Sequence, residues 1–192
     1  MIAVIPIATE NVHKVAEING VLSECGYRVE PISVPKIEVQ SHSLERIALV
    51  AVSTAYSIYG KPVIVEDAGL FVEALKGFPG PYSSYVFKTI GVKGVLRLLE
   101  GLPNRRAYFS SVIALAYRRG VVLFSGRVDG YIALEPRGSG GFGFDPIFVP
   151  EGSTKTFAEM SLEEKNRFSH RARAARKLCE WLVSEEWRQE KQ

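Results

Sequence analysis

The first part of the chain alternates between short continuous apolar runs and apolar residues at helical spacing. Residues 2–8 form an apolar run that is short enough for a buried strand. A helix is predicted to begin near residue 12, with Gly26 as its C-terminal stop. Its apolar face is predicted to comprise Val12, Val15, Ile18 and Leu22. Residues 28–34 predict a second strand.

A longer helix is predicted over residues 43–59, and Ser43 is well placed to cap its N-terminus. Its apolar face is predicted to comprise Leu44, Ile47, Ala48, Ala51, Ala55 and Ile58. Residues 62–66 (PVIVE) predict a short buried strand. Shorter helical segments, including residues 95–99, are expected to follow the sequence GFPGPYSS.

The second half of the chain changes to long β-rich segments and then to helices. Residues 106–117 and 121–128 predict an antiparallel hairpin, closed by a tight turn at Arg118-Arg119-Gly120. Ser161 begins a capping box, and Ser169 is a second candidate cap. The apolar stripe after it comprises Ala174 or Ala175, Leu178 and Leu182. The whole pattern predicts an α/β fold with a mixed sheet and helices packed on it, in one domain over residues 1–192.

Composition and charge exclude several classes of protein. The content of 46% hydrophobic and 23% charged residues is ordinary for a globular protein, and no apolar run is long enough to span a bilayer. The first residues lack the basic start of a signal peptide. Cys25 and Cys179 are expected to be separate buried thiols. The net charge of +3 does not demand a nucleic acid, but it suits a small anionic ligand.

Two stretches could bind phosphate and metal. In TENVHK (residues 9–14), Thr9 and Asn11 add neutral donors to a helix N-terminus and Lys14 adds a positive charge. The alternative is a capped helix with a solvated lysine. In VEDAGL (residues 65–70), Glu66 and Asp67 should point to opposite faces at the end of a strand.

An acid at a strand end before a glycine is a common place for a metal ligand or a general base. An equally plausible alternative is a turn acid that bonds to its own backbone. A divalent cation would need more oxygen ligands, and Glu38 is the best candidate to supply them. Considered alone, Glu38 is expected to be an exposed residue of a strand.

Two further stretches could bind a flat base. The sequence GSGGFGFDPIF (residues 138–148) lacks the Gly-Lys-Ser/Thr ending of a phosphate-binding P-loop. Phe142 could instead stack on a base, and Asp145 could read its edge; the alternative is a glycine-rich turn with Phe142 and Phe144 in the core. In KNRFSHR (residues 165–171), His170 and Arg171 would form a donor-rich rim or a solvated basic helix start.

Together these stretches resemble the inosine-triphosphate pyrophosphatase family. The resemblance lies in residues 9–14, 65–84, 140–152 and 155–171, which occur in the family's order and at its approximate spacing. It implies an elongated α/β fold with two lobes around a central cleft, usually a homodimer. It also implies Mg²⁺-dependent hydrolysis of inosine, deoxyinosine and xanthosine triphosphates to the monophosphate and pyrophosphate, in the cytoplasm.

The resemblance also assigns residues by position. Thr9, Asn11 and Lys14 are expected to bind the triphosphate, and Glu38 and Asp67 the metal, with Asp67 as the catalytic base. The base pocket is expected to comprise Phe142, Gly143, Phe144, Asp145, Lys165, His170 and Arg171. Two positions depart from the family pattern: Glu10 replaces a glycine and is expected to point outward, and Ala68 replaces a serine and leaves only its backbone amide.

Two other functions fit parts of the sequence. The first is a pyrophosphatase for other nucleotides, such as modified pyrimidines. The second is a nucleotide- or RNA-binding module without catalysis, for which the basic residues 171–177 and several aromatic residues would suffice. The second function gives no reason for Glu38 and Asp67, since carboxylates repel a phosphate backbone unless a metal intervenes. We therefore expect no nucleic-acid partner.

Overall fold

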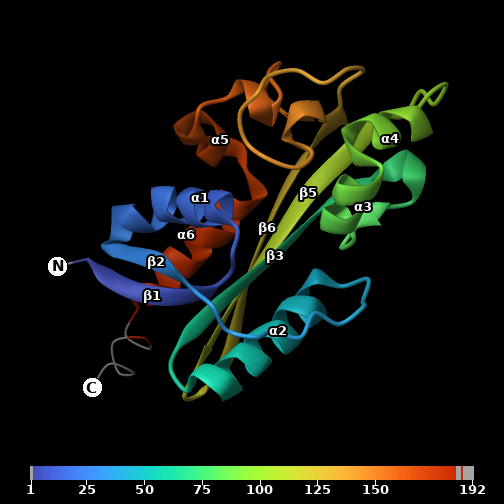
Figure 1. Ribbon diagram of the computed structural model, residues 1–192. Coiled ribbons are helices and arrows are strands. Elements are labelled where there is room, and N and C mark those ends of the chain that lie inside the picture. The colour runs from blue at the N-terminus through green and yellow to red at the C-terminus, as the bar shows by residue number, and fades with distance from the viewer. Residues whose placement is uncertain (1, 185–186, 188–192) are drawn as a thin grey trace.

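The computed structural model describes residues 2–184 and Trp187 and shows a twisted sheet with helices on both faces (Figure 1). The strands are β1 (Ala3–Ala8), β2 (Tyr27–Ile32), β3 (Val63–Val72), β4 (Pro79–Gly80), β5 (Arg106–Tyr117), β6 (Gly120–Ile132) and β7 (Phe148–Pro150). The helices are α1 (Val12–Leu22), α2 (Leu44–Tyr59), α3 (Ser83–Thr89), α4 (Gly91–Leu98), α5 (Leu162–Phe168) and α6 (His170–Leu182). The predicted domain includes residues 1, 185–186 and 188–192, which lie outside the described residues.

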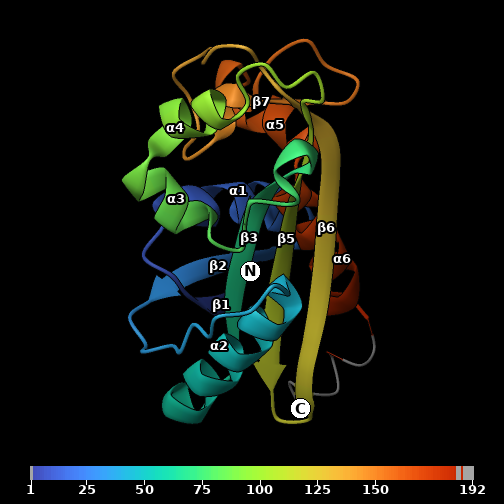
Figure 2. The same ribbon diagram turned by 90° about the vertical axis from the view of Figure 1, so that its right-hand side faces the viewer.

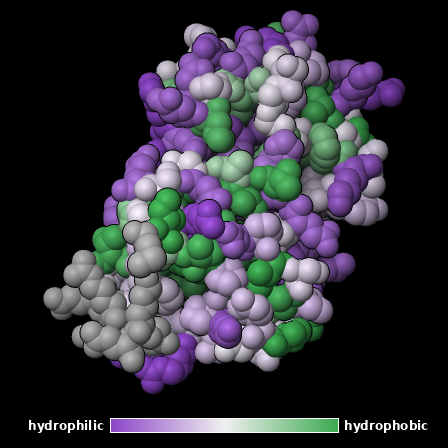
Figure 3. All heavy atoms as spheres, turned by 60° about the vertical axis from the view of Figure 1, so that its left-hand side comes forward, coloured by the Kyte–Doolittle hydropathy of each residue, from purple (hydrophilic) through white to green (hydrophobic). Residues whose placement is uncertain are grey.

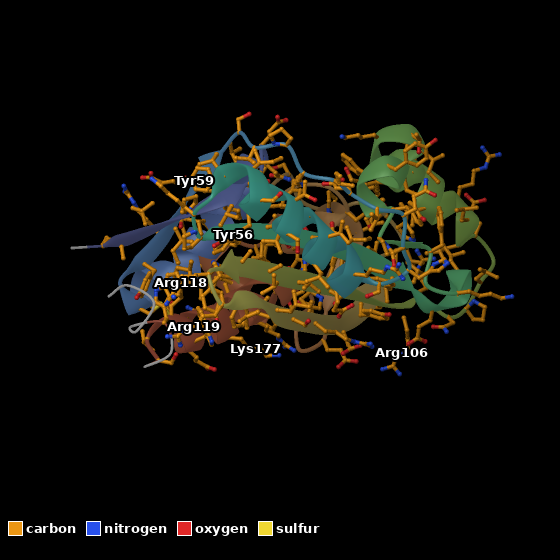
Figure 4. The ribbon with its side chains drawn as sticks, turned by 90° about the horizontal axis from the view of Figure 1, so that it is seen from below. Tyr56, Tyr59, Arg106, Arg118, Arg119 and Lys177 are labelled. Carbon is orange, nitrogen blue, oxygen red and sulfur yellow. A yellow bond between two sulfur atoms is a disulfide. The ribbon has the colours of Figure 1, made fainter. Side chains whose placement is uncertain are left out.

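The sheet is mixed, as the alternating pattern predicts. Its strand order is β2-β1-β3-β5-β6-β7, and β4 pairs with β3. Strand β1 runs parallel to β2 and β3, whereas β5 is antiparallel to both of its neighbours, β3 and β6. The predicted hairpin is confirmed: Arg106 starts β5, and Arg118 and Arg119 form the turn at its other end (Figure 4).

Three long strands connect two lobes, and this confirms the two-lobed expectation (Figures 1 and 2). At about 3.3 Å per residue, β3, β5 and β6 are each roughly 33–43 Å long. In one lobe, α1 and α6 cover one face of the sheet and α2 covers the other; Ile64 packs on the first side, and Val63 and Val65 pack on the second. The other lobe has its own core, to which α3 and α4 contribute Val86 and Val95.

Several local predictions are confirmed, because they depend on neighbours in the chain. The Ser43 side chain accepts from the Arg46 amide and caps α2. Ser161 forms the expected capping box with Glu164, and Ser169 caps α6. The predicted stripe on α6, comprising Ala174, Ala175, Leu178 and Leu182, is fully buried.

Other details differ from the sequence-based expectation. Val12 and Ile58 are 69% and 55% exposed, because each lies at the end of its helix, where it does not reach the sheet. Strand β3 continues to Val72 instead of ending near Glu66, since β5 pairs with it along its whole length. The acidic pair therefore lies in the middle of a long strand.

The expectation for the cysteines was wrong. Cys25 and Cys179 form a disulfide, although 154 positions separate them in the sequence. The turn after α1 packs beside α6 and brings the two Cα atoms to 6.1 Å, which is within the range that a disulfide can bridge. Sequence spacing could not indicate this pairing, because it depends on the packing of two helices from opposite ends of the chain.

No helix among the described residues is long and apolar enough to cross a membrane. On the face shown in Figure 3, hydrophobic side chains form separate patches among hydrophilic ones. Close packing of α6 on the sheet depends on Gly126 of β6, since a Cβ atom there would lie 2.1 Å from the carbonyl oxygen of His170. This contact positions the start of α6 beside the strands that carry the candidate site.

Candidate active site

A cavity of about 740 Å³ lies between the two lobes. Its walls come from the loop between β1 and α1, the segment after β2, the middle of β3, and α3. The glycine-rich loop and the first residues of α6 complete it. The expected site residues that line it are Thr9, Asn11, Lys14, Glu38, Asp67, Ala68, Phe142, Gly143, Phe144, Asp145, His170 and Arg171.

The first loop combines the two interpretations that the sequence allowed. Asn11 caps α1, since its Oδ1 atom accepts from the amides of His13 (3.0 Å) and Lys14 (3.3 Å). Thr9 Oγ1 accepts from the Asn11 amide at 3.2 Å. Lys14 is not simply solvated, because its Nζ lies 2.7 Å from a carboxylate oxygen of Glu66. The loop is thus a rigid, capped turn that faces the cavity.

The two adjacent acids on β3 have different environments, as their alternation along the strand predicts. Glu66 is buried and lies within an ion-pair network, whereas Asp67 lines the cavity. Burial opposes the ionisation of Glu66, but Arg171 and Lys14 outweigh it and hold the pKa of Glu66 well below its usual range. Burial raises the pKa of Asp67 to about 6, and the charges of Glu66 and Glu38 add to this effect against Lys14.

A buried network of ion pairs lies beneath the cavity. Glu17 binds Lys165 Nζ and Arg171 Nη1, each at 2.6 Å. Lys165 also binds Asp145 at 2.6 Å, and Arg171 Nε binds Glu66 at 2.9 Å. With Lys14, the network contains three carboxylates and three cations, so its formal charges balance.

Glu17 is a residue of this network that the sequence analysis missed. It is 3% exposed and lies beside Ile18, on the side of α1 that faces the core. A charged residue on an apolar helix face was the available signal, because such a residue is costly to bury unless it has partners. Its partners are 148 and 154 positions away, so only the tertiary structure identifies them.

Lys165 does not line the cavity, although the family resemblance places it in the base pocket. It is 3% exposed, and its Nζ lies 5.2 Å from the Phe142 ring centroid. His170 and Arg171 do line the cavity, and both are 2% exposed, so the alternative interpretation as a solvated helix start does not hold. Carboxylates beneath the cavity hold Lys165 and Arg171 in place.

The glycine-rich loop supports an aromatic wall. Gly141 has φ +67°, and a Cβ atom there would lie 2.1 Å from Asp145 Oδ2, so only glycine fits. Asp145 Oδ2 in turn accepts from the Phe142 amide at 2.8 Å. Phe142 faces the cavity and stacks with His13, with a centroid distance of 5.3 Å. Phe144 is 3% exposed and belongs to the core, as the alternative interpretation of this loop expected.

Glu38 and Asp67 are suited to a hard divalent cation. Both line the cavity, and the charge of Glu38 contributes to the raised pKa of Asp67. Glu38 lies in a loop rather than in the strand that its sequence suggested, and it pairs with Lys36. Among residues 2–184 and Trp187, no group of three or more acids, histidines or cysteines could hold a metal. A cation bound here would therefore need ligands from a substrate and from water, as Mg²⁺ commonly has in phosphate sites.

The two departures from the family pattern also lie at the cavity. Glu10 lines it, so the expectation that this residue points outward is not confirmed, but it is exposed to solvent, which can screen its charge. Ala68 has no hydroxyl group, and its backbone amide opposes the rise in the pKa of Asp67. Neither position interrupts the ion pairs below the cavity.

The environment of His170 leads to a prediction about how the stability of the fold depends on pH. Its ring stacks on Phe109 at 4.6 Å, and its Nδ1 has no hydrogen-bond partner among the described residues. Burial, with Arg171 and Lys165, lowers the pKa of His170 well below its usual range, while Glu66 opposes this shift. The unfolded chain therefore binds a proton near pH 6.5 that the folded chain does not bind. We expect the free energy of unfolding to fall below pH 6.5 by up to about 1.4 kcal/mol per pH unit.

Urea unfolding of the wild type and of His170→Gln and His170→Phe between pH 5 and pH 7.5 would measure this effect. Both variants should lose the part of the pH dependence that His170 causes, whatever their absolute stability. Identical slopes for all three proteins would contradict the assignment of a neutral, buried His170.

Fold and cavity together define a class: a two-lobed α/β protein whose cleft carries carboxylates, lysines and an aromatic wall. A model of the Ham1 family matches residues 5–181, and the chain belongs to this family. The resemblance inferred from the motifs is thereby confirmed.

Curated relatives agree with this assignment. The chain is 66% identical over 179 residues to the dITP/XTP pyrophosphatase of Hyperthermus butylicus, covering 93% of this chain and 94% of the relative. It is 49% identical over 180 residues to the dITP/XTP pyrophosphatase of Saccharolobus solfataricus, covering 94% of each chain. The expected enzyme class, a nucleoside-triphosphate pyrophosphatase, is confirmed at that level.

Solved structures agree on the fold. The Ham1 protein of Staphylococcus aureus has a TM-score of 0.81 and 32% identity, covering 93% of this chain and 97% of that one. The HAM1 protein of Coxiella burnetii has a TM-score of 0.83 and 33% identity, covering 94% and 98%.

Proposed function

We propose that the protein hydrolyses deoxyinosine, inosine and xanthosine triphosphates to the monophosphate and pyrophosphate with Mg²⁺, and so removes these nucleotides from the cytoplasmic pool. The observation that supports this most directly is the single cavity in which Asp67 and Phe142 both take part. One side of it offers carboxylates and lysines for a phosphate tail, and the other offers an aromatic ring and buried donors for a base.

In this proposal, each side chain has a defined task. Asp67 accepts a proton from the water that attacks the α-phosphorus, and its raised pKa brings it closer to the pH at which a base works best. The Thr9 hydroxyl group and the NH₂ group of the Asn11 side chain donate to the phosphate groups and orient them. When bound at Glu38 and Asp67, Mg²⁺ would neutralise charge on the phosphate oxygens.

Base selectivity would follow from hydrogen-bond polarity. Hypoxanthine and xanthine carry a keto oxygen at C6, which accepts hydrogen bonds, whereas adenine carries an amino group there. Arg171 can only donate, and the network with Glu17 and Glu66 holds it at the cavity wall. Adenine would leave such a donor unpaired, at a cost of about 1–3 kcal/mol per buried group.

A panel of triphosphates, assayed with and without Mg²⁺ for both products, tests this proposal. We expect pyrophosphate and monophosphate from the inosine and xanthosine nucleotides only with the cation present. Preference for a modified pyrimidine would favour the rival pyrophosphatase, and binding without turnover would favour a nucleotide-binding module. The family also implies a homodimer, and sedimentation velocity would test that part of the proposal.

Phe142→Ala is expected to weaken substrates that carry a base far more than it weakens inorganic tripolyphosphate. Stacking of a base on an aromatic ring contributes about 1–3 kcal/mol, which corresponds to a KM increase of roughly 5- to 150-fold. Tyr85→Ala is a suitable control, because Tyr85 is 69% exposed and does not line the cavity. Equal losses for both kinds of ligand would place the base elsewhere.

A further inference from the structure

Three lysines among the described residues line the cavity, and their charges are not equally available to a substrate. They are Lys14, Lys36 and Lys88. Lys14 Nζ lies 2.7 Å from a buried Glu66 oxygen and also donates to the Glu66 carbonyl at 3.1 Å. The formal charges of the network to which Lys14 belongs balance, so a phosphate that binds Lys14 has to compete with the Glu66 carboxylate.

A triphosphate entering this cavity would therefore meet more negative than positive free charge if Lys14 were its main cation. In the part of the chain that the structure describes, three acids outside the balanced network line the cavity, namely Glu10, Glu38 and Asp67. The cations that oppose them there are Lys36 and Lys88. A multiply charged phosphate tail would be repelled at this end without these two lysines.

Lys36 lies on the side of the cavity that carries Glu38. It is half-buried, and its ammonium group forms an ion pair with Glu38. A divalent cation bound by Glu38 would compete with Lys36 for the same carboxylate oxygen. Displacement would leave the ammonium group beside the cation, where an oxygen of the phosphate tail could become its new partner.

Lys88 lies on the opposite side. It belongs to the last turn of α3, in the other lobe, and it is exposed while lining the cavity. Lys88 therefore faces the same cavity as Glu38 and Lys36, but from the other lobe.

We propose that Lys36 and Lys88 form a two-sided clamp for the β- and γ-phosphates, one lysine from each lobe. Lys36 exchanges Glu38 for phosphate when the cation binds, and Lys88 reaches the same phosphates from α3. Lys14 faces the same cavity, but its ammonium group is also held by Glu66. The clamp rests on the proposed function, since it assigns residues to the phosphate end of the same cavity.

Calorimetric titration with inorganic tripolyphosphate, without any metal, tests the clamp independently of turnover. Lys88→Ala and Lys88→Gln should each bind tripolyphosphate about tenfold more weakly, the effect of one charge-assisted hydrogen bond. Lys93→Ala is the matched control, because Lys93 is an exposed lysine on α4 that does not line the cavity. Its affinity should stay within about twofold of the wild type. Unchanged affinity in both Lys88 variants would overturn the clamp.

Lys36→Ala should show effects of opposite sign on two ligands. Binding of Mg²⁺ alone should tighten, because Glu38 loses its competing partner, while binding of tripolyphosphate together with Mg²⁺ should weaken about tenfold. Weaker binding of Mg²⁺ alone, or unaltered binding of tripolyphosphate, would overturn the exchange. If the wild type releases no pyrophosphate from any triphosphate, the proposed function fails, whereas the tripolyphosphate titrations still decide the clamp.

Discussion

Replacing Asp67 by asparagine is expected to lower the rate of pyrophosphate release by about 10³-fold, in the range typical of a lost general base. Asparagine has nearly the same shape, but it cannot accept a proton at neutral pH and is a poorer ligand for Mg²⁺. Asp67 takes no part in the ion pairs below the cavity, whereas its neighbour Glu66 does. The fold should therefore survive, which circular dichroism and thermal unfolding can verify.

Asp129→Asn is a matched control for this experiment. Asp129 is an exposed acid on β6 that pairs with Arg127 and does not line the cavity. Its loss should leave turnover within about twofold, because exposed ion pairs contribute little. Near-normal turnover in Asp67→Asn would show that the proton acceptor is a different group.

Removing the carboxylate of Glu17 is expected to destabilise the protein by about 3–5 kcal/mol, because two buried cations would lose a partner. Lys165 and Arg171 each bind Glu17 at 2.6 Å, and both are almost completely buried. Equilibrium urea unfolding of Glu17→Gln at pH 7 would measure the loss. The variant should also bind inosine nucleotides more weakly, since Glu17 positions Arg171 at the cavity.

Two further variants separate the network from a general effect of substitution on α1. Glu24→Gln alters an exposed acid just beyond the end of α1 and should change the free energy of unfolding by less than about 0.5 kcal/mol. The double variant Glu17→Gln/Lys165→Met should recover part of the loss, because it restores the balance of the network, with two carboxylates against two cations. A loss below about 1 kcal/mol in Glu17→Gln alone would contradict the role of Glu17 as a buried counter-ion.

Much of the fold was predictable because it depends on residues that are close in the sequence. The caps at Ser43, Ser161 and Ser169 involve residues within three positions of the cap. The hairpin turn at Arg118 and Arg119 is similarly local. The predictions were wrong where contacts between distant segments determine the structure. Val12 and Ile58 have the spacing of buried residues but lie exposed at helix ends, and β3 is longer than predicted because β5 pairs with it.

The candidate site was predictable to the extent that its residues form contiguous motifs. Residues 9–14, Asp67 and residues 142–145 all reach one cavity. The environment of each side chain was not predictable in the same way. Lys14 and Lys165 look like free cations in the sequence, yet both have buried carboxylate partners from distant segments.

The amino-acid sequence alone determined the order of the elements, the helix caps and the motifs that mark a nucleotide site, because periodicity, capping and loop chemistry operate over a few residues. Only the tertiary structure decided which charges are neutralised and which face the cavity, and that Cys25 pairs with Cys179. Burial and charge pairing depend on contacts between segments up to 154 residues apart, and no local pattern carries that information.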